Sequence, residues 1–370
     1  MSPMPSLLLL GAGHAHMTVM EAIPRLIERG HSVTVVGPGE RHYYSGMGPG
    51  MLGGHYSPED ISFPVRQMVT QRGGTFITAR ATRIDPQRKR VVLDSGQELA
   101  YDVCSCNTGS HVPSSIVDGD ATDVFPVKPI ENLLAGRESI RRRASRGPVR
   151  IAVVGGGPAA LEVAGNAAAA LTQTGAQGNV AMYAGSSFLR RFPARVRELA
   201  RKELQKARVK LHEGAYASAV HTGEVVLDNG ERYEADIIFT ALGVVPSPLF
   251  AASGLPVGKD GGLAVDAHLR CTEYDDIFGG GDCIWFTPQP LAKVGVYAVR
   301  QNPVLLHNLA ARLEGRPLLT FSPGGEYLLI FNTGSGRGIL HKAGFTFAGR
   351  LAFMVKDWID RRFIRRFQPH

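Results

Sequence analysis

The chain has 370 residues, of which 44% are hydrophobic and 20% are charged, and its formal net charge is +8. This length supports two or three domains with a sizeable core, and the apolar fraction excludes an intrinsically disordered protein. Four cysteines are too few for a disulfide scaffold and fit a cytoplasmic protein. We find no targeting segment and no apolar run near the roughly 20 residues of a spanning helix. We therefore expect a cytoplasmic location, with the inner face of a membrane as a possible peripheral site.

The first recognisable unit is a strand, a glycine-rich turn and a helix. Leu7–Leu10 ends in Gly11-Ala12-Gly13-His14-Ala15-His16, helical spacing continues to Gly30, and residues 32–36 predict a second strand. Such glycines let a pyrophosphate approach the free N–H groups at a helix N-terminus, so the unit predicts a dinucleotide site. His16 replaces the third glycine, which either loosens the packing or places an imidazole near the phosphates. Gly37-Pro38 stands where an acid would bind ribose.

The same pattern recurs in the middle of the chain. Residues 150–154 predict a strand, Gly155-Gly156-Gly157-Pro158-Ala159-Ala160 opens a helix through Leu171, and residues 180–183 predict the next strand. No acid ends that strand. The loop Gly185–Arg191 carries small hydroxyls and arginines that would suit a 2′-phosphate, so NADPH is a candidate beside NADH. The alternative is that Arg190 and Arg191 are only solvated surface charges.

Each unit is followed by a β-rich stretch that returns to a strand, ending at Thr108-Gly109 in the first and at Gly243 in the second. This internal duplication predicts an α/β fold with two Rossmann-like dinucleotide-binding domains, each carrying a β-meander. We expect residues 1–112 and 245–315 to form the first domain and residues 113–244 the second. Residues 316–370 form a small C-terminal α/β segment, with strands at 327–331 and 338–341 and a helix at 350–367.

A third motif, Thr272–Asp282, follows the two glycine-rich turns along the chain. With it, the chain resembles the flavoproteins with two dinucleotide-binding domains, which include pyridine nucleotide–disulfide oxidoreductases, type II NADH dehydrogenases and sulfide:quinone oxidoreductases. The resemblance implies FAD in the first domain, with Asp282 on its ribityl chain, and NAD(P)H in the second. It also implies that a helix near residues 292–309 points its N-terminus at the flavin. Residues 44–50, 127–130 and 293–300 resemble the flavoprotein module fused to some selenophosphate synthetases.

The motifs and the resemblance together assign two sets of binding residues. The FAD set is Gly11, Gly13, His14, Ala15, His16, Pro38, Arg41, Ser45, Ala81, Asn107, Thr108, Gly109, Gly281 and Asp282. The nicotinamide-nucleotide set is Gly155, Gly157, Ala160, Arg190 and Gly243. His42-Tyr43-Tyr44 falls in the loop that the family places beside the flavin ring. We expect no metal, because His14 and His16 have no evident cysteine or carboxylate partner.

The cysteines that related enzymes use for catalysis are missing from this sequence, and their absence narrows the expected chemistry. Disulfide reductases of this fold keep a dithiol in regions that correspond to residues 37–54 or 155–243, and neither contains a cysteine. Sulfide:quinone oxidoreductases keep a cysteine between the two domains, and residues 111–150 contain none. We therefore expect direct flavin chemistry, with a hydride from NAD(P)H and electrons leaving to a quinone or another small acceptor.

Three residues are candidate catalytic groups. Glu162 resembles a proposed acid of type II NADH dehydrogenases; the alternative is that it only orients the nicotinamide or pairs locally. Lys128 and Lys293 would stabilise negative charge on the reduced flavin, or are ordinary surface lysines. Two other functions remain open, namely a quinone reductase-like flavoprotein that oxidises sulfide or a selenium compound, and a non-catalytic flavin-binding subunit.

The C-terminal helix has an apolar arc and a basic end. The arc is Leu351, Val355, Trp358 and Ile359, and arginines follow it. Type II NADH dehydrogenases dock on membranes through a C-terminal segment, and such an end would suit anionic headgroups. The charges are scattered around the helix, however, so packing on the first domain or on a second subunit of a homodimer is the alternative. We expect no nucleic-acid binding, because no reader module accompanies the arginines.

Overall fold

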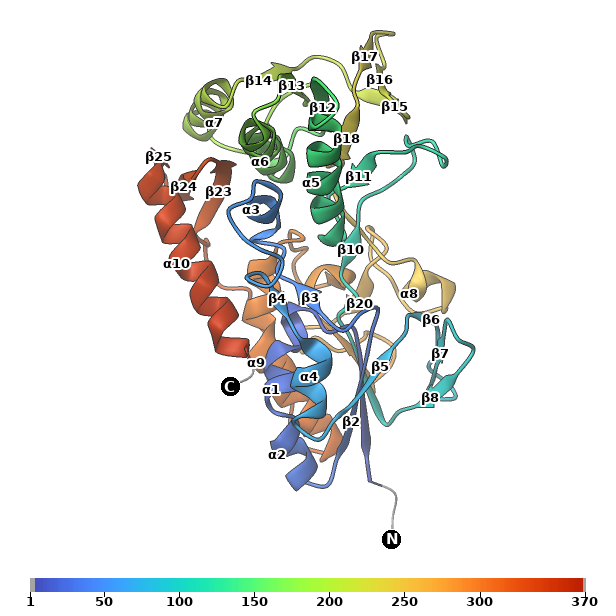
Figure 1. Cartoon of the computed structure of the whole chain (residues 1–370). Helices are drawn as coiled ribbons and strands as arrows, with labels where there is room; N and C mark the ends of the chain where they lie inside the picture. The colour runs from blue at the N-terminus through green and yellow to red at the C-terminus, as the bar shows by residue number, and fades with distance from the viewer. Residues whose placement is uncertain (1–3, 369–370) are drawn as a thin grey trace.

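The computed structural model describes residues 4–368 and contains two parallel sheets, each in its own half of the molecule. Figure 1 shows the first sheet in the lower half and the second in the upper half, with the C-terminal helix running along one side of both. The predicted fold class, two Rossmann-like units in an α/β protein, is confirmed. The exact domain boundaries stay a prediction.

The first sheet is built from segments at both ends of the chain. Its strands, in spatial order, are β21 (Ile277–Gly279), β9 (Val103–Cys106), β1 (Ser6–Leu10), β2 (Ser32–Gly37) and β5 (Thr75–Thr78). All pairs are parallel, and Leu8 of β1 lies between Thr34 and Cys104. Because β1 is central and covered on both faces, it is an almost continuous apolar run. The strands therefore end at one edge, where the first glycine turn begins.

The helices that accompany this sheet differ in one respect from the sequence expectation. The single helix predicted after the first glycine turn is instead η1 (His14–His16), α1 (Met17–Glu21) and α2 (Ile23–Glu28). Pro24 in the first turn of α2 has no N–H, so the hydrogen-bond ladder cannot continue through it. The other helices of this half are α4 (Val65–Thr70), α8 (Leu249–Ala252) and α9 (Gly295–Leu313), and the meander strands are β6 (Ala81–Asp85), β7 (Arg90–Leu93) and β8 (Glu98–Ala100).

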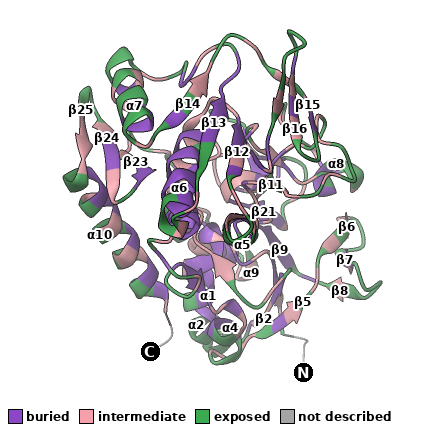
Figure 2. Cartoon of the chain, turned by 45° about the horizontal axis from the view of Figure 1, so that its top comes forward, coloured by how far each residue is buried: buried purple, intermediate pink, exposed green. Residues whose placement is uncertain are grey.

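The second sheet repeats the design. Its order is β11 (Val124–Pro126), β18 (Ile237–Thr240), β12 (Val149–Val154), β13 (Gly178–Tyr183) and β14 (Val209–His212), again all parallel. Its helices are α5 (Glu131–Ala144), α6 (Pro158–Thr174) and α7 (Ala194–Lys206), and its meander is β15 (Ala217–His221), β16 (Glu224–Leu227) and β17 (Arg232–Glu234). Figure 2 shows that α6 and the central strand β12 are largely buried, whereas β14 at the edge is mostly of intermediate exposure. The turn between β12 and α6 lies at the sheet edge that corresponds to the first glycine turn.

Short elements connect these parts. They are β3 (His42–Tyr43), α3 (Gly48–Leu52), β4 (Ser62–Phe63), β10 (Ser110–His111), β19 (Val245–Pro246), β20 (Leu263–Val265), η2 (Gly281–Cys283) and β22 (Ile284–Phe286). The chain passes from one half to the other twice, once at β10 and once at β19, and these two strands pair in antiparallel orientation. The two chain crossings thus lie side by side.

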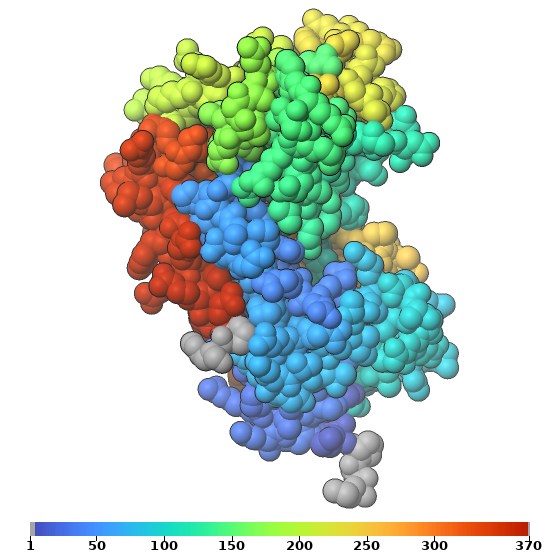
Figure 3. Space-filling model, viewed as in Figure 1, coloured from blue at the N-terminus to red at the C-terminus, as the bar shows by residue number. Residues whose placement is uncertain are grey.

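The C-terminal segment is an antiparallel sheet followed by a long helix. The strands are β23 (Leu329–Gly334), β24 (Arg337–Lys342) and β25 (Phe345–Gly349), and the helix is α10 (Arg350–Phe367). The sequence predicted the first two strands and the helix, but β25 is additional. Figure 3 shows this segment packed along both halves. A Cβ at Gly165 of α6 would lie only 2.2 Å from the Thr333 carbonyl oxygen, so α6 and β23 meet backbone to backbone.

One ion pair fastens the C-terminal sheet to the second half. Glu203 of α7 has only 3% of its side chain exposed, and it accepts hydrogen bonds from Arg337 Nε (2.6 Å) and Nη2 (3.0 Å). Burial raises the pKa of Glu203, but the hydrogen bonds and charges of Arg337 and Lys206 outweigh it and lower the pKa overall. The carboxylate is therefore ionised and depends on Arg337.

We predict that Arg337→Met lowers the free energy of unfolding by about 2 kcal/mol, because it leaves a buried carboxylate with a weaker partner. Since the pKa of Glu203 is lowered, this loss is fully present above the ordinary pKa of a glutamate and disappears as the pH falls below it. Urea unfolding at several pH values measures it. The control is Arg195→Met, whose solvent-exposed pair with Glu198 should contribute much less to stability. Equal losses in both variants would contradict the prediction.

Candidate functional site

Asn107, directly after β9, is the centre of the first glycine motif. Its backbone N–H donates to the Leu10 carbonyl (2.7 Å), and its Nδ2 donates to the Gly280 carbonyl (2.6 Å). Gly11 has a φ of +90°, and a Cβ there would lie 2.2 Å from the Asn107 carbonyl oxygen. A Cβ at Gly13 would lie 2.1 Å from Asn107 Oδ1, and one at Gly281 would lie 2.4 Å from Nδ2. The three motifs therefore meet around one buried amide, where only glycines fit.

Unpartnered polar atoms gather at the same place. Three buried side-chain atoms of the predicted FAD set, His14 Nε2, Asn107 Oδ1 and Thr108 Oγ1, have no hydrogen-bond partner. A buried polar atom without a partner costs roughly 1–3 kcal/mol, so such atoms usually face a bound group or water. The residues around the first glycine turn therefore fit a polar ligand of the FAD type.

Asp282 lies in η2, directly after Gly281, and contacts Ser110 of β10 and Lys128 of the second half, between β11 and α5. Lys128 Nζ lies 2.6 Å from Asp282 Oδ2, and Ser110 Oγ donates to the same oxygen at 2.8 Å. Burial raises the pKa of Asp282, but Lys128, Ser110 and Lys293 outweigh it and lower the pKa overall. Lys293 itself pairs with Asp260 (2.7 Å) and also donates to the Ile284 carbonyl. The structure thus places Lys128 and Lys293 close to Asp282, with their charges already engaged by carboxylates.

The other residues predicted for FAD occupy more varied positions. His16 is fully buried and uses both ring nitrogens within the fold, at 2.6 Å from the Gly11 carbonyl and 2.8 Å from Ser105 Oγ. It therefore fastens the glycine turn to β9, and its ring has no nitrogen left for a phosphate. Ala15 is buried beside Gly280, and Arg41 donates to Ser62 Oγ. Of the remaining positions, Pro38, Ser45 and Gly109 lie in loops that follow strands, and Ala81 is the first residue of the meander strand β6.

An aromatic cluster flanks the same turn. The His14 ring is stacked on Phe363 of α10 (5.7 Å between centroids), and its Nδ1 lies 3.4 Å from His42 Nε2. The Tyr44 ring also contacts Phe363 at 5.1 Å. Burial, reinforced by the charge of His42, lowers the pKa of His14 to about 3, so both imidazoles are neutral at pH 7. The loop that the sequence placed beside the flavin therefore lies between the first glycine turn and the C-terminal helix.

The second glycine motif leaves more open space than the first. A Cβ at Gly155 would lie 2.3 Å from the Ala241 carbonyl oxygen and one at Gly156 would lie 2.2 Å from the Ala184 carbonyl oxygen, whereas one at Gly157 would meet nothing within 4 Å. Ala160 is fully buried, and Gly243, with a φ of +86°, also has open space. The first two glycines serve chain packing. The free space beside Gly157, at the N-cap of α6, suits the approach of a phosphate group.

Glu162 lies in the first turns of α6, where α6, β23 and α10 meet. Its Oε1 accepts the Asn332 N–H (2.7 Å). Burial raises its pKa to about 7, although Lys356 and the Asn332 hydrogen bond oppose that shift. The raised pKa makes Glu162 a suitable proton donor and acceptor at neutral pH.

The sequence analysis missed the partners of Glu162 on the C-terminal helix. Lys356 and Asp360 of α10 are buried and lie 2.7 Å apart (Nζ to Oδ2). Lys356 also donates to the Gly46 carbonyl (2.7 Å), and Tyr44 donates to Asp360 Oδ1 (3.1 Å). Burial lowers the pKa of Lys356, but the negative charges of Asp360 and Glu162 outweigh it and raise the pKa overall. A lysine and an aspartate four residues apart would have been a signal only if the buried face of the helix had been known.

The cysteines are four free, buried thiols, namely Cys104, Cys106, Cys271 and Cys283. Cys283 Sγ donates to the Cys106 and Gly280 carbonyls (3.4 Å each), and burial raises its pKa to about 12. A thiol with such a pKa is a poor nucleophile. These properties disfavour the sulfide- or selenium-oxidising hypothesis.

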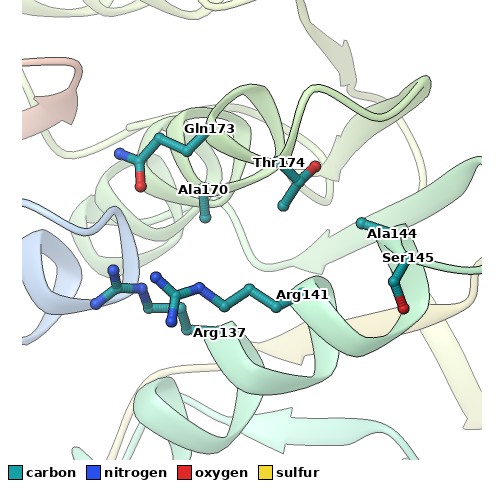
Figure 4. A pocket seen from close by; sticks show the side chains of 7 residues that line it. All are labelled: Arg137, Arg141, Ala144, Ser145, Ala170, Gln173 and Thr174. Atoms are coloured by element: carbon teal, nitrogen blue, oxygen red, sulfur yellow. The ribbon is translucent and has the colours of Figure 1, made fainter.

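A cavity of about 250 Å³ lies elsewhere, between α5 and α6. Figure 4 shows Arg137 and Arg141 of α5 on one side of it and Gln173 and Thr174 of α6 on the other. It contains none of the residues predicted for FAD or nicotinamide nucleotide. Within residues 4–368, no group of three or more His, Cys, Asp or Glu side chains could hold a metal ion.

Comparison with known proteins agrees with this geometry. Residues 5–306 match the family described as pyridine nucleotide-disulphide oxidoreductase. The chain is 26% identical to a type II NADH:quinone oxidoreductase of Staphylococcus saprophyticus, over 96% of this chain and 94% of that protein. It is 26% identical to ferroptosis suppressor protein 1 of Taeniopygia guttata, over 77% and 78%. Its fold is similar to the sulfide:quinone oxidoreductase of Aquifex aeolicus, with a TM-score of 0.79, 17% identity, and coverage of 98% and 91%.

The two glycine cradles and these similarities define an oxidoreductase that uses FAD and a nicotinamide nucleotide. The chain belongs to the pyridine nucleotide-disulphide oxidoreductase family. The predicted superfamily, enzyme class and cofactors are therefore confirmed. The roles of the individual residues and the special likeness to the selenophosphate-synthetase module stay predictions.

We predict that Gly13→Ala lowers the FAD content of the purified protein by at least roughly tenfold. The backbone at Gly13 (φ −79°) tolerates alanine, but the Cβ collides with Asn107, whose amide is held by Gly280. The ratio of flavin to protein absorbance measures this loss. Gly157→Ala is the matched control, because its Cβ meets open space. It should retain FAD and weaken nucleotide binding instead, and equal FAD contents in both variants would refute the assignment.

Proposed function

We propose that this protein oxidises a nicotinamide nucleotide through bound FAD and delivers the electrons to a quinone-like acceptor, with Glu162 as the proton donor. The main support is the position and pKa of Glu162, which lies between the nucleotide half and the C-terminal segment with a pKa near 7. The curated relative from Staphylococcus saprophyticus is named as an NADH:quinone oxidoreductase. The buried thiols leave no reactive dithiol among the described residues.

Each group of the chain has a distinct part in this mechanism. The cradle around Asn107 holds the FAD, and the space beside Gly157 admits the phosphates of the nucleotide. FAD, when bound, supplies the redox chemistry by accepting a hydride and passing two electrons to the acceptor. Reduction of a quinone to a quinol takes up two electrons and two protons, and the hydride from the nucleotide accounts for both electrons and one proton, so the protein must supply the other. A protonated Glu162 would donate one at the acceptor oxygen.

The buried ion pair on α10 prepares Glu162 for this role. Lys356 is held between Asp360 and the Gly46 carbonyl, so its charge has a fixed position near Glu162. After Glu162 has given up its proton, this cation stabilises the carboxylate. Asp360 has the opposite effect and favours return of the proton. Burial, which raises the pKa most, and these two opposing charges together keep both protonation states of Glu162 accessible near pH 7.

We predict that Glu162→Gln slows reoxidation of the reduced flavin by a short-chain ubiquinone by roughly 100-fold, while reduction by a nicotinamide nucleotide stays within about threefold. In the unmodified protein, reoxidation should slow as the pH rises through about 7, because only the protonated Glu162 is a donor. The Gln variant should lack this dependence. Anaerobic stopped-flow absorbance measures both half-reactions.

The matched control is Glu138→Gln, an exposed glutamate of α5 that pairs with Arg141. It should leave both half-reactions and their pH profiles unchanged. An unaltered reoxidation rate and pH profile in Glu162→Gln would remove Glu162 from the mechanism. If no nicotinamide nucleotide reduces the flavin at a useful rate, the proposed function itself is wrong.

We further propose that α10 docks the enzyme on an anionic membrane surface. The helix turns polar Lys356 and Asp360 inward and leaves Leu351, Met354 and Trp358 about 60% exposed (63%, 63% and 59%). Arg362 lies over the Trp358 ring at 5.7 Å, and exposed Arg365 and Arg366 follow. An apolar strip with adjacent arginines is the pattern of an interfacial helix. No helix within residues 4–368 is long and apolar enough to cross a membrane.

We predict that the double variant Leu351→Gln/Trp358→Gln binds phosphatidylglycerol-containing vesicles at least roughly tenfold more weakly, because two side chains no longer enter the interface. Co-sedimentation measures the binding, and salt should weaken what remains. Leu319→Gln, another exposed leucine outside α10, is the control and should bind normally. If the double variant instead changes the sedimentation coefficient and not vesicle binding, the strip is a contact between two copies of the chain.

A further inference from the structure

Ala184 and Gly185 follow β13, so no acidic side chain stands at the strand end nearest the second glycine turn. The Ala184 carbonyl lies against Gly156, and a Cβ at Gly185 would lie 2.6 Å from Cε1 of Tyr216. Gly185 also forms a bridge with Ala215, which fixes this loop against the following strand connection. In dinucleotide-binding folds, an acid at this strand end binds the ribose hydroxyls of a nucleotide without a 2′-phosphate. Here small residues hold that position.

Glu213, which follows β14 and contacts the same loop, already has its negative charge compensated by an arginine. Glu213 accepts the Phe188 N–H (2.7 Å) and two hydrogen bonds from Arg201 Nη2 (2.7 and 2.9 Å). Burial raises the pKa of Glu213, but these bonds and the charges of Arg201 and Arg197 outweigh it and lower the pKa overall. Glu213 is therefore an ionised, compensated group, and its negative charge is shielded from a ligand at this edge.

Two arginines of the loop, by contrast, have no compensating charge. The Leu189 N–H donates to the Gly156 carbonyl (2.8 Å), so the loop folds back on the glycine turn and places Arg190 and Arg191 directly after this contact. Both side chains are exposed, and within residues 4–368 neither makes an ion pair or a side-chain hydrogen bond. Ser186 is also exposed, and its hydroxyl is fixed by the Tyr216 hydroxyl at 2.7 Å.

We infer that the nucleotide site selects the 2′-phosphorylated dinucleotide, NADPH, and that Ser186, Arg190 and Arg191 receive its 2′-phosphate. The inference rests on the proposed function, because it concerns the site that takes the nicotinamide nucleotide. A phosphate brings about two negative charges and oxygens that accept several charge-assisted hydrogen bonds, which two free guanidinium groups and a hydroxyl can supply. NADH offers only a ribose hydroxyl at this position, and no free carboxylate of the loop is available to bind it.

A binding experiment on the FAD-loaded protein tests this without any redox step. Adenosine 2′,5′-bisphosphate and adenosine 5′-monophosphate differ only in the 2′-phosphate, and isothermal titration calorimetry compares their affinities. We expect the bisphosphate to bind at least roughly tenfold more tightly, and kcat/KM to favour NADPH over NADH by a similar factor. Equal affinities, or a preference for NADH, would overturn the inference.

Variants locate the determinant. Arg190→Gln/Arg191→Gln should abolish most of the preference for the bisphosphate and leave binding of the monophosphate within about twofold. Ser186→Glu should reverse the preference, because a carboxylate repels the phosphate and accepts ribose hydroxyls. The control is Arg146→Gln, an exposed arginine before β12 at the opposite edge of the sheet, which should retain the full preference. If Arg190→Gln/Arg191→Gln also retains it, the assignment of the arginines is wrong.

The experiment also separates this inference from the proposed function. If the bisphosphate binds more tightly but neither NADPH nor NADH reduces the flavin, the proposed electron transfer fails and the 2′-phosphate site stands. If both nucleotides reduce the flavin with equal kcat/KM and the two adenosine phosphates bind equally, the proposed function stands and the 2′-phosphate site is refuted.

Discussion

The close approach of the first glycine turn to Asn107 is the constraint on which the rest of the structure depends. The chain returns to this point three times, after β1, after β9 and after β21; Asn107 follows β9, and glycines after the other two strands leave room for it. Because Asn107 is bonded to both Leu10 and Gly280, the three returns have one fixed spacing. That arrangement also fixes Asp282, which binds Lys128 of the second half.

The features that could be predicted from the sequence are those that depend on residues close together along the chain. The glycine turns, the strands before them and the repeated order of elements are local patterns, and the resemblance to flavoproteins used the same segments. The break at Pro24 was a local signal too, but the helical spacing around it masked it. His16 was harder, because its role depends on Ser105, which is far away in the sequence and adjacent only in the sheet.

The partners of Glu162 show where sequence reasoning ends. The apolar arc of the last helix was found correctly, but a hydrophobic pattern does not tell which side faces the protein. The usual assumption would turn Leu351 and Trp358 inward. The structure leaves them exposed and buries a different face, made of Ala352, Phe353, Ile364 and Phe367 with the pair Lys356 and Asp360. The buried Lys356 and Asp360 interact with Tyr44 and Glu162, which lie near the start and the middle of the chain. No local spacing in the sequence relates these residues to α10.

The burial of this lysine–aspartate pair has an energetic consequence for the candidate proton donor. A buried ion pair contributes little net stability, because desolvation offsets most of the attraction. The effect of the Lys356–Asp360 pair on Glu162 is also divided, since the lysine lowers its pKa and the aspartate raises it. Burial is the largest influence that remains, and it exists only while α10 and β23 cover Glu162. The proton affinity of Glu162 therefore depends on how the C-terminal segment packs against α6.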